Sequence, residues 1–175
     1  MDLRGRFDDV LADLEQVAGW STARIRRPVL ILGSLDGIET GVRQLVRSEP
    51  LETMQITIDG QELSMPTPAE TLRIKCALIL KQNAVRDYVD VAALSHRLGM
   101  DEVVKALGSF DELYPQPGGQ SAMQQLIVQL NAPSPYDLDQ VELSQYRALA
   151  APWTDWTEVV KQCAAVAAAL LDAAS

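Results

Sequence analysis

The sequence lacks the motifs of most metal, redox and nucleotide sites. It contains only two cysteines and one histidine in 175 residues. Neither Cys76 nor Cys163 has a second cysteine or a histidine at the spacing of a metal ligand. Both lie in apolar stretches with a helical pattern, so we expect reduced residues of the core. A P-loop, a hydrolase serine motif and a zinc motif are also absent.

Long hydrophobic runs are missing as well. The most apolar run, over residues 163–171, is too short to span a bilayer. The first ten residues, MDLRGRFDDV, lack the apolar stretch of a signal peptide. We therefore expect a cytoplasmic protein with no membrane partner.

Positive charge is scarce. Lys and Arg number 15 against 24 Asp and Glu, which gives a formal net charge of -9 and a pI near 4.5. Such a chain has no general attraction to nucleic acid or to an anionic membrane, so any polyanion would need a local basic patch. Arg24, Arg26 and Arg27 form such a patch. We interpret it as a solvated surface, and contact with RNA phosphates is the alternative.

The first third of the chain combines one helical pattern with strand patterns. A hydrophobic content of 47% is sufficient for a core. Apolar spacing predicts a helix over 6–18, and the next segments predict strands joined by tight turns at Asp36-Gly37 and Asp59-Gly60. The predicted strands cover 28–33, 38–46, 54–58 and 61–65. Together they predict a small, mostly antiparallel sheet near the N-terminus.

From residue 67 the pattern becomes helical. Thr67-Pro68-Ala69-Glu70 combines an N-cap threonine, a proline at the first helical position and a glutamate placed to close a capping box. Further helices are predicted over 85–98, 101–113, 121–130, 137–149 and 155–173, and Ser134-Pro135 repeats the cap-then-proline start. We therefore predict an α+β fold, with a helix and small sheet in residues 1–66 and a helical bundle in residues 67–175.

The first two helices of this bundle carry the densest set of charges on apolar surfaces. Asp87 and Asp90 lie on one side of a helix whose neighbours are suited to burial. They need partners, since an unpaired buried charge costs on the order of several kcal/mol. Arg86, Arg73 and Lys75 are the candidates. The cluster is either an ion-pair network that locks two helices, or a site where Lys75 binds phosphate and an aspartate orients a substrate or acts as a base.

The path from PLETMQITIDG through MPTPAETLRIKCALILKQNAVRDYVDVAAL to HRLG resembles the C-terminal part of the AbiEii/AbiGii nucleotidyltransferase toxins. These are bacterial toxins of type IV toxin-antitoxin systems. The resemblance implies Mg-dependent transfer of a nucleotide from an NTP to an RNA, tRNA or protein acceptor. It also implies an antitoxin or a complementary subunit as a partner.

The resemblance implies a role for each matching residue. Lys75 would contact phosphate, and Arg86, Asp87 and Asp90 match the family's Arg-Asp-x-x-Asp, with Asp87 as the essential acid and Asp90 in support. Arg73 lies beside Lys75 and joins the nucleotide-binding set. Gln82 stands where the family has an arginine, so phosphate stabilisation differs at that position.

The front of the chain departs from this family's pattern. Related transferases place an Asp-x-Asp or Asp-x-Glu pair for magnesium a strand and a turn beyond a glycine-serine turn. Here a single residue separates Ser34 from Asp36, so Asp36-Gly37 is predicted as a hairpin turn and the metal ligands stay unknown. One alternative is an active transferase with ligands such as Glu39 or Asp59. The other is a non-catalytic binding module, or a subunit that needs a partner chain.

Three aromatic or imidazole side chains are weaker candidates. His96, at the end of an apolar helix, is interpreted as a capping or packing residue. Trp153 and Trp156 flank a helix start and are predicted core anchors, with a partner surface as the alternative.

Overall fold

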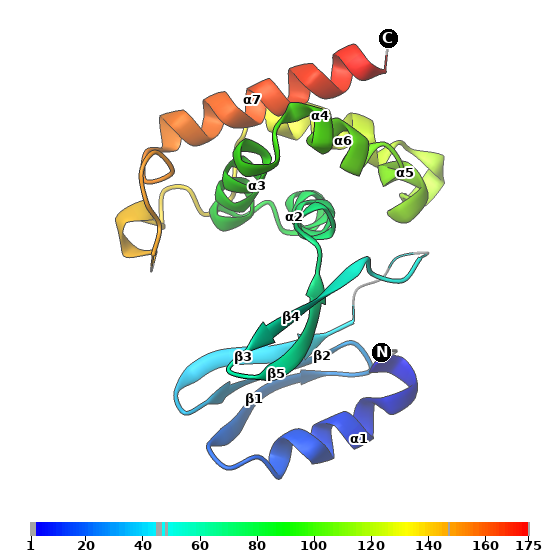
Figure 1. The fold of residues 1–175 in the computed structure, drawn as a ribbon, viewed down its shortest axis with the longest axis vertical. Helices are drawn as coiled ribbons and strands as arrows, with labels where there is room; N and C mark the ends of the chain where they lie inside the picture. The colour runs from blue at the N-terminus through cyan, green and yellow to red at the C-terminus, as the bar shows by residue number, and fades with distance from the viewer. Residues whose placement is uncertain (1–2, 45–46, 48, 147, 175) are drawn as a thin grey trace. The chain divides into compact units, whose positions relative to one another are not determined.

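The computed structural model describes residues 3–44, 47, 49–146 and 148–174 (Figure 1). The fold is α+β, with a small antiparallel sheet near the N-terminus followed by helices, as predicted. The chain divides into two compact units, Met1–Val46 and Arg47–Ser175. The hairpin formed by residues 53–66 belongs to the second unit, although its sequence pattern resembles that of the strands before it.

The first unit is one helix and a three-stranded sheet. The order is α1 (Leu3–Glu15), β1 (Trp20–Arg26), β2 (Leu30–Leu35) and β3 (Ile38–Arg43), with β2 in the middle and both pairs antiparallel. β1 is a strand that the sequence pattern does not predict. Its register with β2 shifts between Thr22 and Arg24, and this bulge interrupts the alternation by which a strand is recognised.

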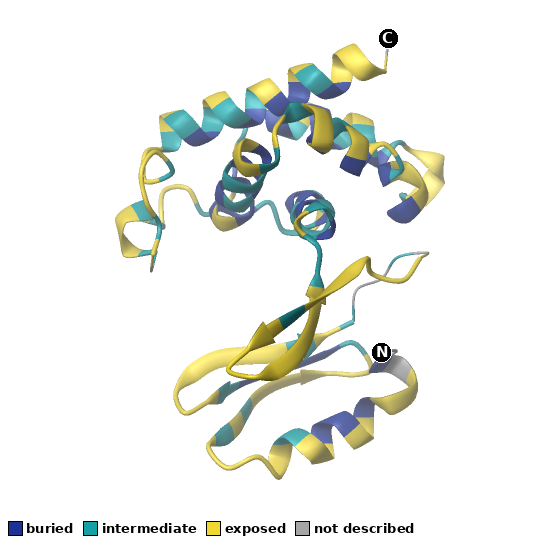
Figure 2. Ribbon diagram, in the orientation of Figure 1, coloured by how far each residue is buried: buried dark blue, intermediate teal, exposed yellow. Residues whose placement is uncertain are grey.

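The core of the first unit lies between α1 and one face of the sheet. It contains four α1 residues and one β2 residue: Leu3, Phe7, Val10, Leu11 and Ile31. Trp20 packs at its edge, and a Cβ at Gly33 would come within 2.6 Å of the Trp20 ring, so only glycine fits there. Figure 2 shows the buried residues of α1 and β2 that form this core.

Both tight turns form as predicted. Asp36 and Gly37 have φ angles of 50° and 79° and connect Leu35 to its partner Ile38. Asp59 and Gly60 have φ angles of 50° and 77° in the second hairpin. Two consecutive left-handed residues match the twist of antiparallel strands, which is why Asp-Gly occurs there.

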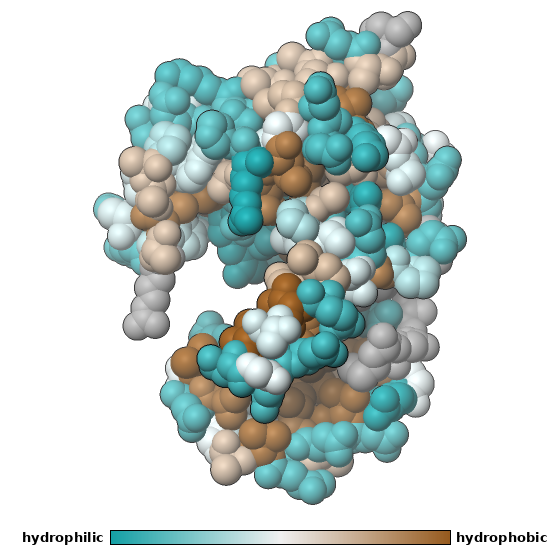
Figure 3. Space-filling view, in the orientation of Figure 1, coloured by the Kyte–Doolittle hydropathy of each residue, from teal (hydrophilic) through white to brown (hydrophobic). Residues whose placement is uncertain are grey.

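The second unit begins with a separate hairpin. β4 (Thr53–Ile58) and β5 (Gln61–Pro66) form a two-stranded sheet of their own, so the predicted strands build two sheets and not one. Four of the hairpin's apolar side chains are exposed: Met54, Ile58, Leu63 and Met65. Figure 3 shows the apolar surface over this hairpin.

The helices of the second unit pack around α2. They are α2 (Pro68–Gln82), α3 (Val85–Leu98), α4 (Met100–Leu107), α5 (Phe110–Leu113), α6 (Ala122–Asn131) and α7 (Trp156–Ala173), with short 3-10 turns at Pro117–Gly119 and Leu143–Gln145. α2 contacts α3, α4 and α6, and α7 packs on the same three helices. Cys76 and Cys163 are free and buried, as expected. Across the described ranges, no helix has the length and apolar character needed to cross a bilayer.

The start of α2 is confirmed only in part. Thr67 caps the helix by accepting a hydrogen bond from the Glu70 backbone N–H at 3.1 Å, and Pro68 is its first residue. The reciprocal arm of the capping box is absent, because the Thr67 N–H donates instead to the Glu52 carbonyl at 3.0 Å. The Glu70 side chain is buried and pairs with Arg47 and Arg73.

The predicted helix over 137–149 is wrong. In its place are turns and the short Leu143–Gln145 segment. The Asp137 carboxylate accepts a hydrogen bond from the Val85 N–H at 2.8 Å, and the Ser134 carbonyl accepts one from the Asn83 side chain at 2.8 Å. Ser134-Pro135 therefore does not start a helix of its own, because this loop caps the beginning of α3.

Candidate functional site

Lys75 on α2 joins both predicted aspartates of α3. Its Nζ lies 2.6 Å from Asp90 Oδ2 and 3.6 Å from Asp87 Oδ1. The three side chains differ in exposure: Asp87 is fully buried, Lys75 is 25% exposed and Asp90 is 43% exposed. One ammonium thus bridges two carboxylates and ties the middle of α2 to the first turns of α3.

Asp87 is the most constrained member of this cluster. Neither of its carboxylate oxygens has a hydrogen-bond partner among the described residues. Burial raises the pKa of Asp87 above its usual value, and the positive charges of Lys75 and Arg86 offset part of that rise. The side chain belongs to the first turn of α3, where the helix dipole favours a negative charge. The arrangement can hold a carboxyl group whose proton is retained to higher pH than in an exposed aspartate.

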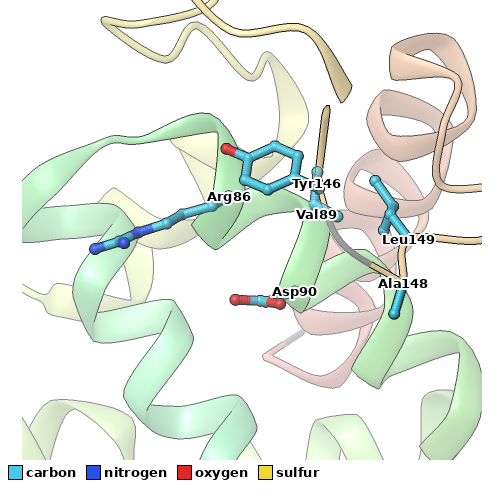
Figure 4. A pocket seen from close by; sticks show the side chains of 6 residues that line it. All are labelled: Arg86, Val89, Asp90, Tyr146, Ala148 and Leu149. Atoms are coloured by element: carbon cyan, nitrogen blue, oxygen red, sulfur yellow. The ribbon is translucent and has the colours of Figure 1, made fainter. Parts of the chain in front are cut away.

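A pocket of about 250 Å³ lies beside this cluster (Figure 4). Its lining comes from α3 and from the chain after the Leu143–Gln145 turn: Arg86, Val89, Asp90, Tyr146, Ala148 and Leu149. In Figure 4 the charged Arg86 and Asp90 occupy one side and Leu149 and Ala148 the other. Burial raises the pKa of the Tyr146 hydroxyl. The pocket therefore presents one charged wall and one apolar wall.

The sequence did not indicate the far wall of this pocket. Tyr146 and Leu149 fall in the segment wrongly predicted as a helix, and they lie 48 and 51 residues beyond Leu98, the last residue of α3. Helical sequence patterns indicate which side chains three or four residues apart are neighbours, and they carry no information on contacts between distant segments.

Two predicted site residues do not join the cluster. Arg73 is two residues from Lys75, so its side chain points about 200° around α2 from it. It pairs with Glu70 and Glu52, both at 2.9 Å, and donates to the Ala106 carbonyl at 2.7 Å. Gln82 is the last residue of α2, and its side chain forms no hydrogen bond with a described residue.

The Arg73 contacts belong to a second ion-pair network around Glu70. The Glu70 carboxylate is fully buried and is flanked by Arg47, which is 6% exposed, and by Arg73. The Glu52 backbone N–H donates to Glu70 Oε2 at 3.2 Å. The Arg47 guanidinium also lies 5.6 Å from the centre of the Tyr114 ring. This network holds the chain before the hairpin against the start of α2.

The weaker candidates lie in packing contacts. The His96 and Trp153 rings meet edge to face at 5.4 Å, and Tyr88 and Trp156 do so at 6.1 Å. Both tryptophans are half-buried and lie outside the buried core, and their rings contact α3 side chains from the start of α7 and the turn before it.

No metal centre is evident in the part of the chain that the structure describes, where no three His, Cys, Asp or Glu side chains converge as ligands. Asp36 and Asp59 occupy hairpin turns and Glu39 is exposed on β3. The expectation of magnesium and an NTP, drawn from the toxin resemblance, has no observation that tests it.

Comparison with known proteins finds mycobacterial proteins that are named for transport. The chain is 36% identical over 132 residues to the heme uptake protein MmpL11 of Mycobacterium tuberculosis, covering 73% of this chain and 13% of that protein. It is 33% identical over 131 residues to the mycolic acid-containing lipids exporter MmpL11 of Mycolicibacterium smegmatis, covering 73% of this chain and 13% of that protein. It is 32% identical over 131 residues to the probable transport protein MmpL11 of Mycobacterium leprae, and this match covers 73% of this chain and 12% of that protein. No family model and no solved structure matches the chain.

The chain thus spans only 13% of the length of the first of these relatives. A match that covers 73% of the chain must include its middle, so α2 and α3 with Lys75, Asp87 and Asp90 lie within the matched segment.

These relatives correct the predicted family and function. The resemblance to AbiEii/AbiGii nucleotidyltransferase toxins is wrong, because the matching curated proteins are transport proteins and not toxins. The toxin-antitoxin assignment, the RNA, tRNA or antitoxin partner and the alternative of a binding module or partner-dependent subunit have no support either. The sequence misled because the charged residues that suggested a nucleotide site, Lys75 and the two aspartates, also serve to join two packed helices.

Proposed function

We propose that this chain acts in MmpL11-type transport, as the counterpart of one segment of those transport proteins. The observation that carries the proposal is the 36% identity over 132 residues to MmpL11 of Mycobacterium tuberculosis. The relatives are named for heme uptake and for export of mycolic acid-containing lipids. We therefore propose that the transported material is heme or a lipid of this class.

Within this function, the cluster of Lys75, Asp87 and Asp90 keeps α2 and α3 in one arrangement. Its support is geometric, since Lys75 is the ammonium that contacts both carboxylates. Loss of that ammonium would leave a buried carboxylate without a counter-ion, which is strongly unfavourable. Transport then depends on the cluster through the shape of the segment and not through chemistry at Asp87.

We also propose that this segment lies on the cytoplasmic side of the membrane. The free thiols of Cys76 and Cys163 agree with a reducing compartment. A reporter protein that becomes active only in the cytoplasm, fused at the matched segment of the Mycolicibacterium smegmatis transporter, tests this side. Activity of a reporter that works only outside the cytoplasm would overturn it.

The test of the function is a chimeric transporter. In a Mycolicibacterium smegmatis strain without MmpL11, the transporter is supplied with its matched segment replaced by this chain, and export of mycolic acid-containing lipids is measured. We expect export to be restored. A chimera that is present in the membrane at the normal level but restores no export would overturn the proposal.

Two variants of the chimera separate the cluster from general charge effects. Lys75→Met removes the bridging ammonium and should reduce export. Lys105→Met removes an exposed ammonium that pairs with exposed Glu102 at 3.4 Å, and it should leave export unchanged. Equal loss in both variants would contradict the role assigned to Lys75.

A further inference from the structure

Three arginines of the first unit share one face of the sheet. Arg26, Leu30 and Arg43 are partners in adjacent strands, and Arg24, Leu32 and Gly41 form the next row. Paired residues of neighbouring antiparallel strands point to the same side, and residues two apart on a strand also share that side. Arg24, Arg26 and Arg43 therefore form one cluster, which we call the arginine face.

The arginine face is the side of the sheet that α1 does not cover. The intervening row is Ile25, Ile31 and Val42, and Ile31 belongs to the core that α1 covers. Since side chains alternate along a strand, the rows on either side of Ile31 point away from α1. All three arginines are exposed. Leu30, which lies between Arg26 and Arg43, is buried at 8% exposed, and Leu32 in the next row is 38% exposed.

The charges of this face are not neutralised within the structure. None of its three arginines forms an ion pair with a residue that the structure describes. Standard strand geometry separates Arg24 from Arg26 by about 7 Å and Arg26 from Arg43 by about 10 Å. The acidic residue on the same face, Glu39, is about 13 Å along β3 from Arg43. A local concentration of positive charge thus stands out on a chain whose net charge is -9.

Arg27 is not part of this face, although the sequence groups it with Arg24 and Arg26. Its guanidinium pairs with Asp8 and lies 5.0 Å from the centre of the Phe7 ring on α1. Arg43, sixteen residues further along the chain, takes the place of Arg27 through the pairing of β2 with β3.

We propose that the arginine face docks onto an anionic lipid surface through the lipid phosphates. Guanidinium groups form paired hydrogen bonds with phosphate oxygens, and three of them spaced over about 10 Å match a surface of repeated headgroups. The cytoplasmic leaflet carries a negative surface potential that attracts basic segments near a membrane. The choice of a membrane over another polyanion rests on the proposed transport function.

The test is binding of the full chain to lipid vesicles. Vesicles of phosphatidylglycerol and phosphatidylcholine in equal amounts are compared with vesicles of phosphatidylcholine alone by cosedimentation. We expect binding to the anionic vesicles, weakened by added salt because exposed charges are screened. The variant R24Q/R26Q/R43Q should bind about 100-fold more weakly, since each arginine near an anionic surface contributes about fivefold.

A matched control variant has the same net charge as R24Q/R26Q/R43Q. The variant K81Q/R97Q/K161Q also removes three exposed positive charges, all from the second unit. It should bind the anionic vesicles as the unchanged chain does. Equal loss in both triple variants, or no binding of the unchanged chain to anionic vesicles, would overturn the proposal. Displacement of the chain from the anionic vesicles by an RNA oligonucleotide that it binds more tightly would overturn the proposal as well.

The vesicle result does not depend on transport. Binding by the arginine face together with a chimera that fails to restore export would leave the docking surface standing and remove the proposed function. Restored export without vesicle binding would leave the proposed function standing and remove the docking surface.

Discussion

The Lys75 ammonium lies 3.6 Å from a carboxylate oxygen of Asp87, and that buried carboxylate has no hydrogen bond with any described residue. The pair therefore depends on charge attraction more than on hydrogen bonding. In a buried setting such a pair contributes little net stability against an apolar replacement, but the loss of one partner is costly.

Lys75→Met should destabilise the second unit. The change leaves the Asp87 carboxylate buried without its nearest positive charge. We expect the free energy of unfolding at pH 7 to fall by about 2 kcal/mol. This loss is smaller than that for breaking a fully buried ion pair, because Lys75 is partly exposed. Urea unfolding measures it. The double variant Lys75→Met/Asp87→Asn should recover part of the loss, and a single variant as stable as the unchanged chain would contradict the assignment.

Asp87 should make the stability depend on pH in a defined direction. Burial raises its pKa in the folded state, so between the unfolded value, about 3.9, and the raised folded value the folded state binds more protons than the unfolded state. The contribution of Asp87 to stability is therefore greatest near pH 4 and below, and decreases as the pH rises through this window. Urea unfolding of the unchanged chain and of Asp87→Asn between pH 4 and 7 isolates the effect. A difference between the two that grows in favour of the unchanged chain with rising pH would contradict it.

Glu70→Gln should cost more than any change at Glu52. Glu70 is fully buried between Arg47 and Arg73, and its neutralisation removes the one carboxylate that pairs with both of these largely buried guanidinium groups. We expect a loss of about 3 kcal/mol in the free energy of unfolding. Glu52→Gln, which changes a half-exposed partner of Arg73, should cost less than about 1 kcal/mol. Equal losses in urea unfolding would show that burial of Glu70 is not decisive.

Asp137→Ala should weaken the start of α3. Ala84, the N-cap residue of α3, supplies no side-chain hydrogen bond, and Asp137 provides one to the Val85 N–H from fifty-two residues away. Removal of an N-cap acceptor costs about 1 kcal/mol, which corresponds to a decrease in Tm of roughly 2–4 °C for a chain of this size. Asp139→Ala, at an exposed neighbouring carboxylate, serves as the control and should leave Tm unchanged.

The predictable part of this fold consists of signals confined to a few consecutive residues. Asp36-Gly37 and Asp59-Gly60 form the turns that their backbone preferences favour, and Thr67-Pro68 starts α2. Gly99 ends α3 with a φ of 82°, which an L residue rarely adopts. For the site, the sequence grouped Lys75 with Asp87 and Asp90 because buried charges need partners, and the structure brings these three together.

Features that depend on distant residues were beyond the sequence. Glu70 has the spacing of a capping box but turns toward Arg47 and Arg73, since a buried carboxylate is better stabilised by two cations than by one backbone N–H. The Ser134-Pro135 start signal is overridden because Asp137 caps α3 instead.

The sequence by itself therefore determined the turns, most of the helices and the α+β class, because each follows from the conformational preferences of adjacent residues. Only the tertiary structure decided which charges meet. It placed Arg43 beside Arg26 across β2 and turned Arg27 away toward Asp8, and it set Tyr146 against α3. Those pairings arise from packing between segments far apart in the chain, and no local pattern encodes them.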